Sequence, residues 1–146
     1  MSKLIAANKR AGFDYFIEEK LTAGIVLVGT EVKSLRLGKV TLTEAFVTIN
    51  NGEAWVHQLL IGHYSHGNRN NHEENRKRKL LLHKDQIENF DHVSRTKGLA
   101  IIPLKIFFEN SYVKLEIGLA KLKKIHDKRE TLKAKDAQRK MDTRDY

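Results

Sequence analysis

The sequence contains no cysteine, a single proline and no long apolar segment. Without cysteine the chain forms neither disulfides nor thiolate metal sites, which fits a reducing compartment. The longest apolar runs, such as residues 24–29 and 99–104, are too short to span a bilayer. The N-terminal residues also lack the apolar stretch of a signal peptide. We therefore expect a soluble, cytoplasmic protein.

An excess of positive charge dominates the composition. The 146 residues include 27 Lys and Arg against 18 Asp and Glu, which gives a formal net charge of +9 at pH 7. Hydrophobic residues make up 40%, enough for one modest core. Because such a charge attracts polyanions, nucleic acid is the expected partner, and an anionic membrane surface is the weaker alternative.

Short β-rich segments separated by turn signals fill most of the first 120 residues. We expect strands over residues 13–28, 46–49, 54–61, 99–109 and 112–120, and residues 80–82 should re-enter the core. Residues 50–53 and 110–111 predict hairpin turns, because Asn and Gly accept positive φ. Pro103 lies inside an apolar run and indicates a sheet edge or a bulge.

Two helices are predicted between these strands. Residues 30–36 form a short helix that Thr30 can cap and Gly38 can end. Residues 83–97 place apolar side chains on one face, and Gly98 follows as a stop. Together the elements predict a mainly β fold, a small OB-like antiparallel β-barrel, closed or nearly closed, with two or three short α-helices.

The chain changes character at residue 121. We expect residues 1–120 to form the β-barrel and residues 121–146 to form a separate basic tail. Apolar residues in the tail make no continuous stripe at helical spacing, and a short isolated helix is marginal in water. The tail is therefore predicted to be disordered when free and helical when docked on a polyanion.

Basic residues gather in three clusters. These are Lys9–Arg10, residues 76–79, and tail residues Lys121, Lys123, Lys124, Lys128, Arg129, Lys133, Lys135, Arg139, Lys140 and Arg144. Lysine and arginine neutralise phosphates and release their counterions, while nearby aromatic and histidine rings can stack on bases. One basic run is usually solvated surface, but three runs in one chain favour nucleic-acid contact.

Candidate catalytic and metal sites are weak in comparison. His63, His66 and His72 lie in one polar segment, but their spacing matches no zinc pattern. No catalytic triad, carboxylate pair or Gly-rich phosphate loop is evident. We predict no metal site, no cofactor and no catalytic residue, so the protein is expected to be a binder and not an enzyme.

Several motifs in sequence order resemble those of the SsrA-binding protein (SmpB) family. They are ANKRA at residues 7–11, DYFIEE at 14–19, AGI at 23–25, GTEVKSLR at 29–36, GNR at 67–69, RKLLLHK at 78–84 and HDKRET at 126–131. The resemblance covers almost the whole chain, and such an ordered series is far more specific than any one motif.

This resemblance implies an OB-like barrel that binds tmRNA (SsrA RNA) in bacterial trans-translation. In the family, the barrel holds the tRNA-like domain of tmRNA, and elongation factor Tu delivers the alanyl-tmRNA to the A site of a stalled 70S ribosome. The tail lies as a helix in the empty mRNA channel, against small-subunit rRNA at the decoding centre. The nascent chain is then tagged for degradation, and the ribosome is rescued.

The resemblance also implies two sets of site residues. Contacts with tmRNA fall on Asn8 and Leu81, and the surrounding motifs add Lys9, Arg10, Glu31, Lys33, Arg36, Arg78 and Lys79. Contacts of the tail with the ribosome fall on Lys123, Lys124, His126, Asp127, Lys128, Arg129 and Lys133. For Leu81 the alternative is core packing, and for Asn8 it is a local turn bond to backbone.

Three residues depart from the family pattern, and two other functions are considered as alternatives. Thr22 stands where a carboxylate is expected, so no site is carried over to it, and Leu122 replaces a usual glycine. Glu74 stands where a proline is common. The first alternative function is a generic OB-like nucleic-acid binder without a role in ribosome rescue, and the second is an RNA-processing enzyme. A monomer is expected.

Overall fold

The computed structural model describes residues 2–65 and 71–124, which form a β-rich domain with three short helices. The strands are β1 (Ser2–Ala7), β2 (Tyr15–Ile25), β3 (Val40–Thr41), β4 (Phe46–Asn50), β5 (Glu53–His57), β6 (Leu60–Ile61), β7 (Arg78–Leu81), β8 (Ala100–Glu109) and β9 (Tyr112–Leu122). The helices are α1 (Ala11–Asp14), α2 (Gly29–Arg36) and α3 (Lys84–Lys97).

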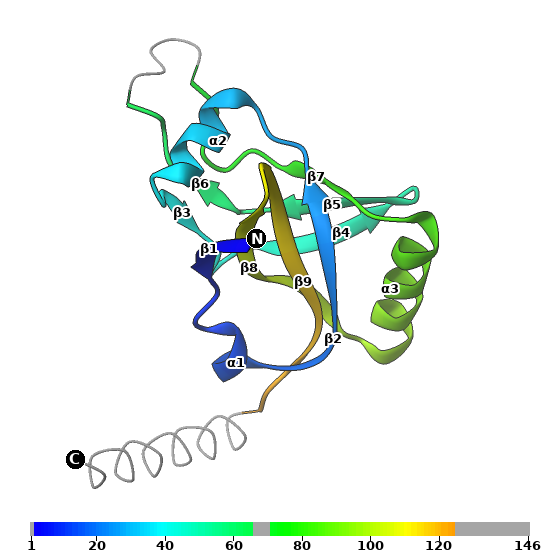
Figure 1. The fold of residues 1–146 in the computed structure, drawn as a ribbon. Coiled ribbons are helices and arrows are strands. Elements are labelled where there is room, and N and C mark those ends of the chain that lie inside the picture. Colours follow the sequence, from blue (N-terminus) through cyan, green and yellow to red (C-terminus); the bar gives the residue numbers. More distant parts are fainter. Residues whose placement is uncertain (1, 66–70, 125–146) are drawn as a thin grey trace, which may run out of the picture.

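Seven of the strands form one sheet in the order β1-β8-β9-β2-β7-β5-β4, and β3 pairs with β6 in a second sheet (Figure 1). Every pairing between the described strands is antiparallel. The predicted mainly β, OB-like fold is confirmed. The large sheet does not close, however, because β1 and β4 remain its two edges.

Both predicted hairpins are present. Asn51 and Gly52 have φ angles of 52° and 74° between β4 and β5, and Asn110 has a φ of 58° between β8 and β9. These left-handed conformations suit the asparagine and glycine that the sequence places there. The bulge predicted at Pro103 is also present, since the register of β8 against β9 shifts between Pro103 and Lys105.

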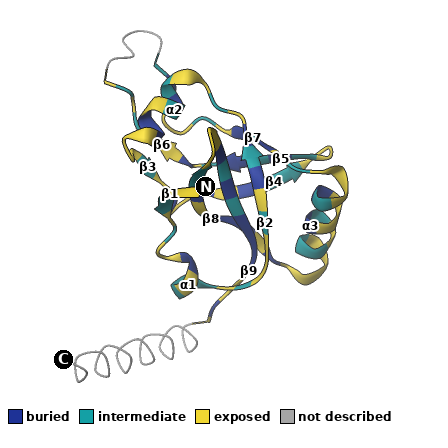
Figure 2. Ribbon diagram, viewed as in Figure 1, coloured by how far each residue is buried: buried dark blue, intermediate teal, exposed yellow. Residues whose placement is uncertain are grey.

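The core lies against the strongly curved β2, β8 and β9, and much of β9 is buried in Figure 2. Alternate residues of β9 point inward, namely Val113, Leu115, Ile117 and Leu119. The side chains of Leu104 and Ile17 pack so closely on Gly118 of β9 that only glycine fits there. A Cβ at this position would lie 2.9 Å from Leu104 Cδ1 and 3.0 Å from Ile17 Cγ2. Phe90 of α3 joins the same core.

Two local predictions differ from the structure, and two elements at the N-terminus were not predicted. The strand expected over residues 54–61 is broken at Gln58, whose φ of 57° turns the chain from β5 into β6 of the other sheet. Val28 and not Thr30 occupies the N-cap position of α2, and its backbone N–H donates to the Glu31 carboxylate. The sequence also did not predict β1 and α1, because the first residues have no clear periodicity.

The predicted helix at residues 83–97 is confirmed as α3. His83 occupies its N-cap position and donates its backbone N–H to Gln86 Oε1 at 3.0 Å. Gly98 ends the helix in the left-handed conformation with a φ of 65°. Among residues 2–65 and 71–124, no helix is long and apolar enough to cross a membrane.

Candidate nucleic-acid interface

A fully buried ion pair joins α2 to β7. Glu31 in the first turn of α2 and Arg78 at the start of β7 have no exposed side-chain surface. Arg78 Nε donates to Glu31 Oε2, and Arg76 Nη2 donates to Glu31 Oε1 at 2.6 Å. The backbone N–H of Val28 also donates to Glu31 Oε1, at 2.9 Å. The carboxylate therefore receives three donors, which is what a buried charge requires.

Arg78 also holds the chain segment that leads into β7. Its Nη1 donates to the carbonyl oxygens of Leu59 at 2.6 Å and Arg76 at 2.9 Å. Its Nη2 donates to the carbonyl oxygens of Glu74 at 3.2 Å and Glu73 at 3.4 Å. One guanidinium thus fixes α2, the chain before β6 and the approach to β7 relative to one another.

Both members of this pair are charged at neutral pH. Burial raises the pKa of the Glu31 carboxyl, but the hydrogen bonds from Arg76 and Val28 and the charge of Arg78 outweigh it and hold that pKa below its usual value. Burial lowers the pKa of Arg78, and the charge of Glu31 opposes this shift. Arginine nevertheless stays protonated, because its guanidinium is a very weak acid.

His72 makes a second link between the same elements. Its Nε2 lies 2.9 Å from the carbonyl oxygen of Ile61, and its Nδ1 lies 2.8 Å from Thr30 Oγ1. Because a carbonyl only accepts, Nε2 carries the proton and Nδ1 accepts from the Thr30 hydroxyl. The Asn71 amide exchanges two hydrogen bonds with the backbone of Tyr64, at 3.1 and 2.6 Å. These polar residues thus bind the approach to β7 firmly to its surroundings.

Exposed cations project from α2 above this buried framework. Lys33 and Arg36 are both exposed, whereas Glu31 on the same helix is buried. Lys33 Nζ lies 5.4 Å from the centroid of the Tyr64 ring, within the range of a cation–π contact. The helix therefore anchors itself through one face and presents positive charge on the other.

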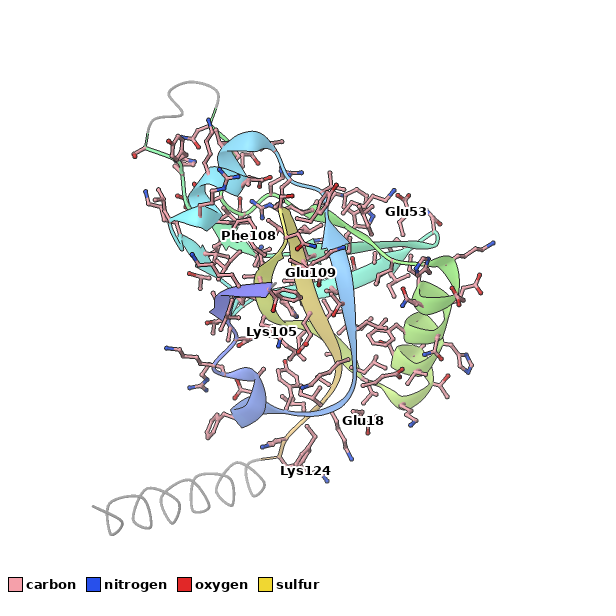
Figure 3. All side chains as sticks on the ribbon, viewed as in Figure 1. Glu18, Glu53, Lys105, Phe108, Glu109 and Lys124 are labelled. Atoms are coloured by element: carbon pink, nitrogen blue, oxygen red, sulfur yellow. The ribbon has the colours of Figure 1, made fainter. Side chains whose placement is uncertain are left out.

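More cations lie along β7 and its neighbour β5. Lys79 Nζ lies 2.8 Å from Glu53 Oε2, and both side chains are about two-fifths exposed, at 42% and 44%. Lys77 Nζ lies 4.8 Å from the centroid of the Trp55 ring. Glu53 lies near the β4–β5 turn in Figure 3. An exposed ion pair of this kind is weak, so Lys79 can exchange its partner for a phosphate at little cost.

Leu81 ends β7 with 55% of its surface exposed, whereas its neighbour Leu80 is 1% exposed. The alternative that Leu81 is a core residue is therefore wrong. Leu81 pairs with Gly24 of β2, and a Cβ at Gly24 would lie 3.2 Å from Leu81 Cβ. Glycine thus leaves room for the leucine on the surface.

A hollow of about 340 Å³ lies beside Leu81. Its lining residues are Thr22, Gly24, Leu81, Leu82, His83, Gln86 and Lys114. Sequence reasoning missed Thr22, Gln86 and Lys114, which come from three different elements. The pairing of β2 with β9 brings Thr22 and Lys114 together, and Gln86 joins them because α3 follows β7, the other neighbour of β2. No local motif reports that pairing.

The side chain of Asn8 is anchored at the β8 bulge, while its backbone carbonyl oxygen accepts from the Ala11 N–H at 3.2 Å in a local turn. Its Nδ2 donates to the carbonyl oxygen of Pro103 at 3.1 Å, and its backbone N–H donates to that of Leu104 at 2.7 Å. Its Oδ1 is buried and has no hydrogen-bond partner in the described part of the chain. The Asn8 side chain therefore fixes the start of the segment that carries the exposed Lys9 and Arg10.

Arg10 borders a second, smaller hollow at this end of the domain. Its guanidinium lies 4.9 Å from the centroid of the Phe13 ring and 3.4 Å from the Asp14 carboxylate. The hollow has a volume of about 170 Å³, and Asn8 and Tyr15 also line it. Sequence reasoning did not anticipate this hollow.

The predicted ribosome contacts in the tail are mostly outside the described residues. This holds for His126, Asp127, Lys128, Arg129 and Lys133. Lys124 is described and exposed, but Lys123 is only 8% exposed and packs against the domain. β9 runs to Leu122, two residues beyond the boundary predicted for the barrel.

The structure distributes the predicted tmRNA contacts over two regions. Glu31, Lys33, Arg36, Arg78, Lys79 and Leu81 belong to the neighbouring elements α2 and β7. Asn8, Lys9 and Arg10 lie beside α1, near where the chain leaves β9 (Figure 1). Three strands separate β1 from β7 in the sheet, but Leu4 of β1 and Arg36 of α2 line the same hollow of about 580 Å³.

The described residues include no group of three His, Cys, Asp or Glu side chains placed to hold a metal ion. His72 instead uses both ring nitrogens in hydrogen bonds to Thr30 and Ile61.

The open antiparallel sheet, the buried anchor of α2 and the exposed cations beside Leu81 define a small, basic OB-like RNA-binding domain. The chain belongs to the SmpB protein family, whose family model matches residues 5–145.

Relatives described as SsrA-binding proteins match nearly the whole chain. An SsrA-binding protein of Pelobacter propionicus is 54% identical over 139 residues, which cover 95% of this chain and 91% of that protein. An SsrA-binding protein of Shouchella clausii is 53% identical over 140 residues, which cover 96% and 90% of the two chains.

A solved structure agrees with these relatives. It is described as "tmRNA-SmpB: a journey to the center of the bacterial ribosome" and contains a chain that is 45% identical to this one. The superposition has a TM-score of 0.70 and covers 82% of this chain and 85% of the other.

Proposed function

We propose that this protein binds the tRNA-like domain of tmRNA and acts with it on stalled 70S ribosomes in trans-translation. The tmRNA–protein complex enters the empty A site, with elongation factor Tu delivering the alanyl-tmRNA. The nascent chain is then tagged for degradation and the ribosome is released. Relatives at more than 50% identity carry the description "SsrA-binding protein", which supports this proposal.

The observation that carries the proposal is the exposed Leu81 on a rigid, cation-flanked strand. An apolar side chain at 55% exposure can pack against an unstacked base or a ribose. Lys79 on the same strand and Lys114 across the adjoining hollow supply positive charge for phosphates. We assign tmRNA contacts here to Lys79 and Leu81, and further contacts to Lys33 and Arg36.

The second set of tmRNA contacts comprises Asn8, Lys9 and Arg10. Asn8 is half-buried, and its side chain ties this segment to the carbonyl oxygen of Pro103. Lys9 and Arg10 are exposed beside it and can neutralise phosphates. Because three strands separate this region from Leu81, a single small RNA loop cannot fill both, whereas a folded RNA domain can.

Glu31 and Arg78 take a positioning role in this proposal and not a contact role. Their side chains have no exposed surface, so no RNA group can reach them without unfolding α2 from β7. Instead, their ion pair holds Lys33, Arg36 and Leu81 in fixed relative positions. A preorganised site of this kind loses less entropy on binding.

The basic tail that follows β9, from residue 123 to residue 146, is proposed as the ribosome-binding part. His126, Asp127, Lys128, Arg129 and Lys133 are assigned to rRNA at the decoding centre and in the mRNA channel. The high density of lysine and arginine in this segment supports electrostatic binding to RNA. We propose that Lys124 belongs to the same surface.

The protein is further proposed to be a cytoplasmic binding factor without catalytic activity. Incubation with RNA and a divalent cation is expected to give no turnover. Cleavage of the RNA in a manner that depends on a single side chain would favour the RNA-processing alternative.

Direct binding measurements test the proposal. Affinities for tmRNA, bulk tRNA and duplex DNA should be compared at several matched salt concentrations, because non-specific binding falls steeply with salt. A preference for tmRNA that persists as salt rises is expected. Equal affinity for all three nucleic acids would instead support a generic OB-like binder.

A further inference from the structure

Lys123 is the first residue after β9, and its side chain folds back onto the domain. Lysine is almost never fully buried unless it has partners, yet Lys123 is only 8% exposed. Its Nζ donates to the carbonyl oxygen of Gly12 at 2.8 Å and lies 4.8 Å from the centroid of the Phe16 ring. Its backbone N–H donates to the carbonyl oxygen of Asp14 at 2.9 Å.

These contacts have ordinary physical causes. Gly12 lies in α1, and the last carbonyl groups of a helix have no partners within the helix, so lysine side chains often bind them. The negative face of the Phe16 ring attracts an ammonium group. The backbone bond to Asp14 continues the β2–β9 ladder beyond the Tyr15–Leu122 pair. The hydrogen bond to Gly12, the cation–π contact with Phe16 and the backbone hydrogen bond to Asp14 therefore all restrain Lys123.

We propose that Lys123 is a positioning residue that fixes the point and direction at which the tail leaves the folded domain. We call the contacts of Lys123 with Gly12, Asp14 and Phe16 the tail latch. Lys121 and Lys124, on either side of it in sequence, are exposed. The ammonium of Lys123 can reach a phosphate only by giving up the tail latch, so it differs from these neighbours.

The tail latch links the two RNA-binding parts of the protein. Gly12 and Asp14 follow directly after Asn8–Arg10, which are the proposed tmRNA contacts beside α1. Lys123 immediately precedes the tail, which is proposed to bind the ribosome. The tail latch therefore fixes where the tail starts relative to the bound tmRNA, an inference that rests on the proposed function.

Two variants and a matched control test this role. Lys123→Met removes the charge and the donor but keeps a long apolar side chain. Phe16→Leu removes the ring without changing any charge, and because Phe16 is 46% exposed the domain should still fold. Lys121→Met removes a neighbouring exposed charge and leaves the tail latch intact. Thermal unfolding of each variant verifies folding.

Tagging on stalled ribosomes and tmRNA affinity should respond differently. Lys123→Met and Phe16→Leu are each expected to lower tagging by about tenfold, since small errors in placement weaken reactions strongly. Both should leave tmRNA affinity, and its dependence on salt, within about twofold of the unchanged protein, because no phosphate contact is lost. Lys121→Met should leave tagging within about twofold, because a single exposed charge contributes little.

Other results would overturn the role of the tail latch. If Lys123→Met lowers the salt dependence of tmRNA binding by about one counterion while Phe16→Leu has no effect, Lys123 is a phosphate ligand. If Lys121→Met lowers tagging as much as Lys123→Met, only the net charge of the segment matters.

A failure of the proposed function would look different from a failure of the tail latch. In the first case the unchanged protein itself would show no preference for tmRNA. The tail latch could then still be measured by NMR in the free protein. The ε-protons of Lys123 should shift upfield because of the Phe16 ring, and this shift should vanish in Phe16→Leu. Absence of the shift in the unchanged protein would overturn the inference.

Discussion

The carboxylate of Glu31 and the guanidinium of Arg78 meet in the interior of the protein, and neither side chain is exposed. The two residues are 47 positions apart in the sequence, so the contact forms only when α2 and β7 come together. Such a pair adds little net stability, because both charges lose their hydration. Removing one partner is costly, however, since the other charge is then left buried and unpaired.

Glu31→Gln is therefore expected to lower the free energy of unfolding by about 3–5 kcal/mol. The variant keeps the shape of the side chain but leaves Arg78 and Arg76 without their counter-charge. Urea unfolding followed by circular dichroism measures the loss. Glu53→Gln is the matched control, because it breaks the exposed pair with Lys79, and the expected loss is about 1 kcal/mol or less. Similar losses in both variants would contradict the special role of the buried pair.

Acid should destabilise the protein through the same carboxyl group. The pKa of Glu31 lies below its ordinary value of 4.5 in the folded state, so the unfolded chain takes up the proton more readily. The stabilisation from this group is complete above that ordinary value and is lost as the pH falls through the folded pKa. Urea midpoints measured from about pH 6 to about pH 3 should fall more steeply for the unchanged protein than for Glu31→Gln. Parallel curves would contradict the prediction.

Local signals predicted much of the fold because they depend on single residues. Gly98 and Asn110 adopt positive φ where the sequence indicated a helix end and a turn. Gln58 also has positive φ, but glutamine carries no such signal, and the break between β5 and β6 could not be foreseen. Its conformation is imposed by the two sheets that the flanking strands join.

The candidate site was harder to predict because it depends on which face of a strand is buried. Leu80, Leu81 and Leu82 form an unbroken apolar run, and such a run does not reveal which side chain points outward. The pairing of Leu81 with Gly24 determines that the Leu81 side chain is the one that points outward. Likewise, nothing in the basic sequence around Lys123 distinguishes it from Lys121, and only the position of α1 buries it.

Leu81→Ala is expected to weaken tmRNA binding by about tenfold while the protein keeps its stability. Full burial of a leucine side chain on binding is worth about 1.5–3 kcal/mol, and the exposed Leu81 loses little in the free protein. Leu122→Ala is the matched control, because Leu122 is 63% exposed and ends β9, at the other end of that strand from Lys114. Fluorescence anisotropy with labelled tmRNA measures both affinities. A loss of equal size in Leu122→Ala would show that the effect is not specific to the Leu81 surface.

Lys33→Gln should change the salt dependence of tmRNA binding more than it changes stability. A lysine that neutralises one phosphate contributes about 0.9 to the slope of log K against log salt. The slope is therefore expected to fall by about that amount in the variant. Lys97→Gln on α3 serves as the control, because Lys97 is also exposed but lies away from α2. An unchanged slope in Lys33→Gln would remove Lys33 from the tmRNA surface.

Truncation after Lys124 should separate the two RNA partners of the protein. This cut keeps the whole sheet, α1 and the tail latch, so the tmRNA-binding domain should stay folded and its affinity should remain within about twofold. Tagging on stalled ribosomes should nevertheless be lost, because the residues assigned to the decoding centre are gone. The double variant Lys128→Ala and Arg129→Ala tests the same step with the chain length unchanged, and tagging should fall at unchanged tmRNA affinity. If the truncated protein loses tmRNA binding and tagging together, the division into a tmRNA-binding domain and a ribosome-binding tail is wrong, since the tail would then contribute directly to the first contact.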